Sequence, residues 1–235
     1  MLPAQPRPTQ AVILAGGRGT RLAPLTDTRS KAMVEFHGKP FVEYLVELAK
    51  SQGFEKFLFL LGYQPESVRS YFGDGARWGV KIEYSVTPVE DETGTRVRKA
   101  LPLLDPVFLL MYCDNYWPMP FPAMWERFSH SDALALVTVY RNADSYTRDN
   151  LVVEADGRVS LYDKTRKAPG LKGVDLGFII MRREALQRLP EGNVSLEATL
   201  YPSLIADRKL IAHVTDHRYY SVGNLDRSAQ ILGQA

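Results

Sequence analysis

Apolar residues fall in short runs along this chain, and segments with helical spacing separate the runs. Several runs are continuous and rich in Val, Leu, Ile and Phe, which is typical of strands buried on both faces. These runs are residues 12–15, 55–62, 107–112 and 133–140. Residues 80–86 alternate apolar and polar side chains and predict a half-buried strand. The helical spacing predicts helices over residues 40–52, 65–72, 95–104 and 120–130.

This alternation of strands and helices predicts an α/β protein with a mostly parallel sheet and helices on both of its faces. Asp156-Gly157 joins two further strand-like segments, 151–155 and 158–163, and predicts a hairpin. The hairpin makes a mixed sheet the expectation. Residues 178–182 predict another strand, and a helix is expected near 225–232. With no repeat or linker in the sequence, we expect one domain over 11–235, preceded by a loose polar tail at 1–10.

Composition and charge exclude several classes of protein. The 235 residues include 29 Lys and Arg against 27 Asp and Glu, and this balance gives no support to nucleic-acid or membrane-surface binding. The longest apolar runs are too short to span a bilayer, and the tail lacks the apolar core of a signal peptide. Cys113 is the only cysteine, which excludes an internal disulfide and fits a reducing compartment. A cytoplasmic protein is the expectation.

The stretch AVILAGGRGTRL, residues 11–22, carries the clearest chemical signal. A buried strand leads into Gly16, Gly17 and Gly19, whose backbone can turn tightly and approach a ligand closely. Arg18 and Arg21 add positive charge, so the turn is suited to phosphate. It is not a P-loop, because no Lys-Ser or Lys-Thr pair follows at the required spacing. Leu22 stands where a dinucleotide fingerprint has its third glycine, which counts against a nicotinamide-dependent oxidoreductase.

A longer segment, GGRGTRLAPLTDTRSKAMVEFHGKPFVEY, resembles the opening of the sugar-1-phosphate nucleotidyltransferases. Their signature is G-G-x-G-T-R-L followed by P-K-P. The first half matches fully, whereas the second reads Ser30-Lys31-Ala32. Weaker matches follow in the family's order at Gly94-Thr95, Cys113-Asp114-Asn115, Asp163-Lys164 and residues 220–224. Among family members, the chain is most similar to short bacterial enzymes of the heptose-1-phosphate guanylyltransferase type.

The resemblance implies a single-domain, Rossmann-like (GT-A-like) fold and a defined reaction. A sugar 1-phosphate attacks the α-phosphorus of a nucleoside triphosphate, and pyrophosphate leaves. The nucleophile is already an anion, so catalysis should rest on cations and backbone N–H groups rather than on a side-chain base. The implied partners are these two substrates, and the implied cofactor is Mg²⁺. The resemblance leads us to expect guanine as the base, read by the glycine turn and residues 84–94.

The resemblance also implies roles for individual residues. Arg21 would hold the triphosphate and Lys31 the reacting phosphates, while Asp114 would bind Mg²⁺. The implied nucleotide-binding residues are Ala15, Gly16, Gly17, Gly19, Thr20, Gly94 and Thr95, and the sugar-binding residues are Asn115, Asn150, Asp163, Lys164 and Asp175. The simpler alternatives are solvated surface charges for the lysines and arginines, a capping role for Asp114 and an exposed turn at Asp163-Lys164.

One position departs from the family in a way that bears on activity. Many relatives place a second magnesium-binding aspartate near the end of the domain, where this chain has Ser221. A hydroxyl is a poorer ligand for Mg²⁺ than a carboxylate. Either Asp114 and the substrate phosphates suffice, or Asp175, Asp216 or Asp226 substitutes. The remaining alternative is an impaired homologue that binds nucleotide sugars in a regulatory role.

Overall fold

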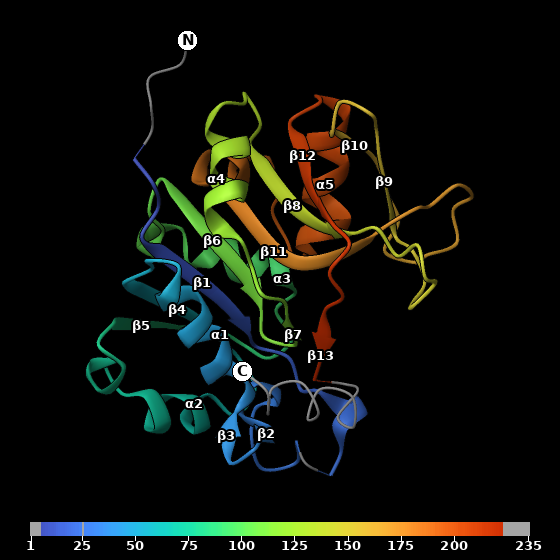
Figure 1. Cartoon of the computed structure of the whole chain (residues 1–235). Helices are drawn as coiled ribbons and strands as arrows, with labels where there is room; N and C mark the ends of the chain where they lie inside the picture. The colour runs from blue at the N-terminus through green and yellow to red at the C-terminus, as the bar shows by residue number, and fades with distance from the viewer. Residues whose placement is uncertain (1–5, 25, 223–235) are drawn as a thin grey trace. The chain divides into compact units, whose positions relative to one another are not determined.

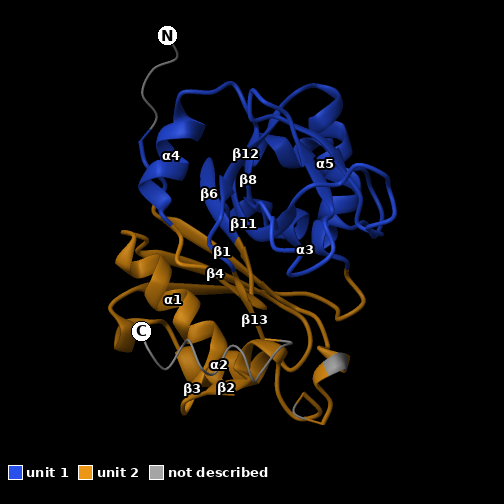
Figure 2. Cartoon of the chain, turned by 45° about the vertical axis from the view of Figure 1, so that its right-hand side comes forward, with its two compact units in different colours: residues 1–8, 92–110, 120–218 blue, residues 9–91, 111–119, 219–235 orange. Residues whose placement is uncertain are grey.

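The computed structural model describes residues 6–24 and 26–222, and these residues form two compact units. Unit 1 takes its described residues from 6–8, 92–110 and 120–218, and unit 2 from 9–91, 111–119 and 219–222 (Figure 2). The helix expected near 225–232, Asp226 and the first half of the expected tail lie outside the described residues. Each unit is built from separate stretches of sequence, so neither is a continuous half of the chain.

The main sheet has seven strands within the described part of the chain (Figure 1). They are β1 (Gln10–Ala15), β4 (Lys56–Leu61), β5 (Lys81–Val86), β6 (Val107–Tyr112), β8 (Ala135–Tyr140), β11 (Val174–Arg182) and β12 (Leu210–Thr215), in the hydrogen-bonded order β12-β8-β11-β6-β1-β4-β5. β4 runs parallel to both β1 and β5, and β12 runs parallel to β8, whereas β11 is antiparallel to β8. The predicted α/β class with a mixed, mostly parallel sheet is confirmed.

Unit 2 contains the first strand and the helices that follow it. Helix α1 (Phe41–Ser51) buries one apolar face, and α2 (Pro65–Phe72) begins with a proline at its first position, which suits a helix start. Two short pairings complete the unit: β2 (Glu35–Phe36) with β3 (Lys39–Pro40), and β7 (Asn115–Tyr116) with β13 (Tyr220–Ser221). All six residues of β1 are buried, as the sequence predicts for a strand inside the sheet.

Unit 1 contains α3 (Thr93–Lys99), α4 (Phe121–Ser129) and α5 (Leu196–Ala206). α4 and α5 lie on opposite sides of strands β8, β11 and β12 (Figures 1 and 2). α5 also contacts α3 and β10. No helix within the described ranges is both long and apolar enough to cross a membrane.

The structure corrects the sequence prediction at three elements. The hairpin forms as predicted from β9 (Leu151–Val153) and β10 (Val159–Tyr162), but it is a separate two-stranded sheet, and β11 supplies the antiparallel strand of the main sheet. The helix expected to reach residue 104 ends at Lys99, because Pro102 disfavours helical backbone before it, and a 3-10 turn, Leu101–Leu103, follows. Helix α5 was not predicted, since Pro202 lies inside it.

Candidate functional site

The glycine turn of unit 2 follows directly after β1. The N–H of Tyr63 donates to the Gly16 carbonyl at 3.0 Å, and the Thr26 hydroxyl donates to the Gly19 carbonyl at 3.1 Å. Gly19 has a φ of 67°, a left-handed conformation that favours glycine. A Cβ atom added to Gly19 would lie 2.8 Å from the Cβ of Lys31. The glycine therefore permits both the turn and the close passage of the lysine.

Lys31 reaches from this turn to Asp114. Its Nζ lies 2.9 Å from Asp114 Oδ2, and the two side chains are 17% and 32% exposed, respectively. Lys31 begins the 3-10 helix Lys31–Met33, which Ser30 caps by accepting a hydrogen bond from the N–H of Ala32. Ser30 has φ −60° and ψ 146°, and its own N–H donates to the Ser67 hydroxyl. This backbone matches what a proline would impose, so the lysine is held although both prolines of the signature are absent.

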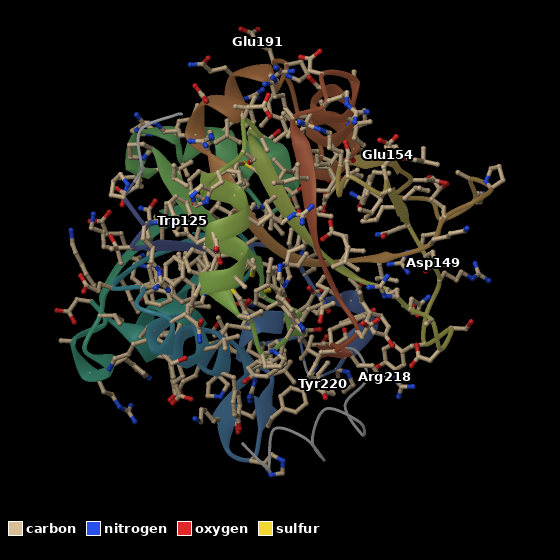
Figure 3. All side chains as sticks on the ribbon, turned by 45° about the horizontal axis from the view of Figure 1, so that its top comes forward. Trp125, Asp149, Glu154, Glu191, Arg218 and Tyr220 are labelled. Atoms are coloured by element: carbon tan, nitrogen blue, oxygen red, sulfur yellow. The ribbon has the colours of Figure 1, made fainter. Side chains whose placement is uncertain are left out.

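Asp114 follows β6 and is tied to the strand β13. The N–H of Val222 donates to the Asp114 carbonyl at 2.9 Å, and β13 pairs with β7 so that Ser221 lies opposite Asn115. Tyr220 stacks on Tyr116 with ring centroids 6.5 Å apart, and Figure 3 labels Tyr220 in this strand. Ser221 is thus next to the strand that follows Asp114, which is where the resemblance places a second carboxylate.

The remaining predicted residues of the turn extend toward the segment that precedes α3. Ala15 ends β1, opposite Leu61 of β4. The Arg18 guanidinium lies 3.6 Å from the Glu90 carboxylate and 5.3 Å from the centre of the Tyr63 ring. Glu90 belongs to residues 84–94, the segment predicted to read the base. Gly17 has open space around it, because no atom lies within 4 Å of an added Cβ. Thr20 and Arg21 lie in a 3-10 turn, and the Arg21 side chain is outside the described part of the structure.

In unit 1, the structure brings together the predicted sugar-binding residues Asn150, Asp163 and Asp175. Asn150 is buried, and its side-chain oxygen accepts a hydrogen bond from the N–H of Asp175 at 2.9 Å. Its carbonyl accepts one from the N–H of Asp163 at 2.8 Å. Asn150 directly precedes β9, and Figure 3 labels Asp149 and Glu154, which lie on either side of this segment in the sequence. One buried asparagine therefore holds the backbone at both acidic positions, through its side-chain oxygen at Asp175 and its backbone carbonyl at Asp163.

The two carboxylates in this cluster have opposite environments. Asp163 accepts hydrogen bonds from the Thr165 hydroxyl and from the N–H groups of Ala168 and Lys167, each at 2.7 or 2.8 Å, and these hold its pKa well below the usual range. Asp163 thus organises the turn that follows it. Burial raises the pKa of Asp175 to about 6, although the Tyr201 hydroxyl donates to it at 3.1 Å.

Lys164 contacts the start of helix α5. Its Nζ donates to the Ser195 hydroxyl at 2.8 Å and lies 3.7 Å from Glu197 Oε2. The Lys164 side chain is 51% exposed, whereas that of Glu197 is 12% exposed. A half-exposed ammonium with one side held by the protein is well placed to contact an anion on the other side.

Gly94 and Thr95 lie at the start of α3, where it meets the segment before α5. Both N–H groups donate to the Val194 carbonyl, at 2.9 and 3.1 Å. The Thr95 hydroxyl donates to the Gly192 carbonyl and accepts from the N–H of Val194. An added Cβ at Gly94 would lie 2.8 Å from the Val194 carbonyl oxygen, so only glycine fits there. These two residues belong to unit 1, whereas the glycine turn belongs to unit 2.

Comparison with known proteins identifies the family. The model of the nucleotidyl transferase family matches residues 10–167, which include the glycine turn, Lys31, Asp114 and Lys164. The chain is a nucleotidyl transferase family member. The predicted resemblance to sugar-1-phosphate nucleotidyltransferases is confirmed.

The relatives of this chain are named for several different sugar phosphates. It is 29% identical to the N-acetylmuramate α-1-phosphate uridylyltransferase of Neisseria meningitidis, covering 96% of this chain and 99% of the relative. It is 28% identical to a D-glycero-α-D-manno-heptose 1-phosphate guanylyltransferase of Campylobacter jejuni, covering 69% and 72%. It is 27% identical to a mannose-1-phosphate guanylyltransferase of Mycobacterium tuberculosis, covering 84% of this chain. It spans 55% of that last relative and 55% to 60% of three others.

A solved structure supports the fold of this chain. The crystal structure described as a glucose-1-phosphate thymidylyltransferase from Bacillus anthracis superposes with a TM-score of 0.84 at 18% identity, and 94% of each chain is covered. At this level of identity the similarity concerns the fold.

Several polar residues that contact the candidate site were not predicted from the sequence. Thr93, Ser195, Glu197 and Tyr201 all contact predicted residues, and the last three belong to α5 or its cap. Recognition of that helix would have revealed them, because Ser195 followed by Glu197 is typical of a helix start. Pro202 lies inside α5 and argues against a helix there, so neither the helix nor these residues could be predicted.

The donor atoms available for Mg²⁺ in unit 2 centre on Asp114. Within residues 6–24 and 26–222, no group of three or more His, Cys, Asp and Glu side chains could hold a metal ion. Magnesium often takes one or two carboxylates and completes its shell with substrate phosphates and water. Asp114 therefore fits a Mg²⁺ that binds together with a nucleotide.

Proposed function

We propose that this chain joins a nucleoside triphosphate to a sugar 1-phosphate, giving a nucleotide sugar and pyrophosphate. The observation that carries the proposal is the 2.9 Å pair of Lys31 Nζ and Asp114 Oδ2 beside the glycine turn. A cation and a carboxylate thus lie together in unit 2 beside the turn that carries the family signature, which supports the roles proposed for them at the phosphates.

In the proposed reaction, an oxygen of the sugar phosphate forms a bond to the α-phosphorus. The bond from the α-phosphorus to the bridging oxygen of the β-phosphate breaks, and pyrophosphate carries away the electron pair. No proton needs to move, because the attacking oxygen is already ionised. Lys31 and the backbone N–H groups of the glycine turn stabilise the negative charge of the transition state.

Mg²⁺, when bound with the nucleotide, supplies charge neutralisation at the phosphates, and Asp114 would hold it. Lys31 Nζ lies 2.9 Å from Asp114 Oδ2, so the ammonium orients the carboxylate that would hold the metal. Asp114 would hold the metal, and the Lys31 ammonium beside it would add a second positive charge for the phosphates.

The acceptor sugar is assigned to the unit 1 residues Asn150, Lys164 and Asp175. The exposed side of the Lys164 ammonium would bind the sugar phosphate. Asp163 is assigned a structural role in the turn that follows it. Its oxygens already accept hydrogen bonds from the Thr165 hydroxyl and from backbone N–H groups of that turn. We propose GTP and a heptose or hexose 1-phosphate as the substrate pair.

The test is pyrophosphate release across a panel of nucleoside triphosphates and sugar 1-phosphates with Mg²⁺. Lys31→Met should lower kcat by about 100-fold on the active pair, the size of effect seen when one transition-state contact is removed. Lys39→Met is the matched control, because Lys39 also pairs with a carboxylate of unit 2, Glu47, at 2.7 Å. Equal losses in the two variants would contradict the role of Lys31.

A second function is favoured by Ser221, which the strand register places opposite Asn115. With a hydroxyl in place of the second carboxylate, the chain would bind nucleotide sugars without making them. No pyrophosphate release across the whole panel, together with a rise in melting temperature when a nucleotide sugar is added, would establish this second function over the first.

A further inference from the structure

A hydrogen-bonded cluster joins the starts of α3 and α5 to the end of the β9–β10 hairpin in unit 1. At its centre is Glu197 Oε2, which accepts hydrogen bonds from the Ser195 hydroxyl at 2.8 Å and the Thr93 hydroxyl at 3.1 Å. The Lys164 ammonium lies 3.7 Å from the same oxygen. Ser195 bridges the two charged groups, because it donates to Glu197 and accepts from Lys164 at 2.8 Å.

Each hydroxyl group in this cluster donates one hydrogen bond and accepts at least one other. Thr93 donates its proton to Glu197 and accepts from the N–H of Leu196 at 2.9 Å. Ser195 accepts from the N–H of Ala198 as well as from Lys164. Both hydroxyls have one fixed arrangement of donor and acceptor, and this fixes the position of the carboxylate relative to both helices.

We propose that Glu197 is a positioning residue that holds the Lys164 ammonium in place for the phosphate of the acceptor sugar. The inference rests on the proposed function, because it concerns how the sugar phosphate is bound. Glu197 does not contact the substrate. It acts through Lys164, whose four-carbon side chain would otherwise sample many conformations in solvent.

The negative charge of Glu197 is what this role requires. Joining the two helices needs only an acceptor for the Ser195 and Thr93 hydroxyls, which a neutral glutamine oxygen also provides. A carboxylate that is only 12% exposed loses much of its hydration, and a nearby cation offsets that loss. The Lys164 ammonium supplies such a cation, and its own exposed side stays open to a phosphate.

Glu197→Gln separates these roles, because it keeps the acceptor oxygen and removes the charge. With the active substrate pair, we expect the KM for the sugar 1-phosphate to rise about tenfold, as for the loss of a charge-assisted contact. The KM for the nucleoside triphosphate should not change. In a Lys164→Met background, the same substitution should change neither constant further, because the group that it positions is gone.

Glu191→Gln is the matched control. Glu191 is an exposed glutamate in the loop before α5, labelled in Figure 3, and its substitution removes the same charge from the same unit. A KM for the sugar 1-phosphate that stays unchanged in Glu197→Gln, or that rises equally in Glu191→Gln, would overturn the inference.

A second measurement needs no substrate. Labelling of Lys164 by an amine-reactive reagent, read by peptide mass spectrometry, should become severalfold faster in Glu197→Gln and stay unchanged in Glu191→Gln. If the wild-type chain releases no pyrophosphate, the proposed function fails while this labelling still decides the contact. Unchanged labelling in Glu197→Gln overturns the positioning role.

A purely structural role for Glu197 has its own signature. If Glu197→Gln alone does not fold, the Lys164→Met/Glu197→Gln double variant should fold, because it removes both charges together. If neither variant folds, Glu197 serves the joint between the helices and the inference is overturned.

Discussion

Gly19 and Lys31 illustrate how one backbone angle governs the candidate site at the scale of single residues. Two effects would destabilise any side chain at Gly19. The left-handed backbone disfavours it by about 1–2 kcal/mol, and its Cβ would lie 2.8 Å from the Cβ of Lys31. Lys31 must therefore shift for an alanine to fit, and we expect that shift to weaken its 2.9 Å contact with Asp114.

Gly19→Ala should accordingly lower both the free energy of unfolding and the rate of pyrophosphate release. We expect a loss of about 1–2 kcal/mol in urea unfolding and a fall of at least about tenfold in kcat. Gly17→Ala is the control for stability, since an added Cβ there has no atom within 4 Å. Equal unfolding midpoints for the two variants would contradict the role assigned to Gly19.

Asp175 gives a prediction on pH. Its folded-state pKa is raised from 3.8 to about 6, mainly by burial. Between about pH 4 and pH 6 the folded carboxyl keeps its proton while the unfolded one loses it, so the free energy of unfolding falls as pH rises through this window. Asp175→Asn removes the ionisation and should flatten that part of the curve, measured by urea unfolding at a series of pH values. A wild-type slope that persists in Asp175→Asn would show that another group is responsible.

At the scale of secondary-structure elements, helix α5 depends on its first residues. Ser195 caps the helix by accepting from the N–H of Ala198, and it also donates to Glu197. Ser195→Ala should therefore lower the free energy of unfolding by about 1 kcal/mol, the usual cost of losing a helix cap. Ser160→Ala on β10 is an exposed serine control and should be neutral. A neutral Ser195→Ala would mean that the cap is dispensable.

Elements with a clear period could be predicted from the sequence, and those with conflicting signals could not. Helix α2 and strand β6 have the predicted bounds, because apolar spacing, a proline at the helix start and a continuous apolar run all agree there. Helix α5 was missed because Pro202 conflicts with its apolar pattern. The hairpin was predicted from its Asp-Gly turn, but its separation from the main sheet depends on contacts distant in sequence.

In the candidate site, too, some features could be predicted from the sequence and others could not. The glycine turn, Lys31 and Asp114 could be named from a local signature. Their pairing could not, because 83 positions separate the lysine from the aspartate. The roles of Ser195, Glu197 and Tyr201 depend on which helix face meets which loop, and a single sequence does not encode that in any short pattern.

At the scale of the whole molecule, β13 pairs with β7 in unit 2. Tyr220 and Ser221 therefore lie next to the strand that follows Asp114, although about a hundred positions separate them from Asp114 in the sequence. Ser221→Asp should place a carboxylate beside that strand and lower the Mg²⁺ concentration needed for half-maximal activity by about tenfold, because Mg²⁺ favours carboxylate oxygens. Ser160→Asp adds the same charge at an exposed position of β10 in unit 1 and should have no effect. An unchanged Mg²⁺ requirement in Ser221→Asp would mean that the side chain at 221 does not face the metal.

The order of the strands along the chain also sets an order of assembly during translation. The ribosome synthesises the glycine turn, Lys31 and Asp114 in the first half of the sequence. It synthesises Tyr220 and Ser221, which pair with β7, about a hundred residues later. A nascent chain therefore carries Asp114 for some hundred residues of synthesis before Val222 can bind its carbonyl. Because the chain grows at about 5–20 residues per second, this interval lasts roughly 5 to 20 seconds, long enough for a chaperone to bind the incomplete unit 2.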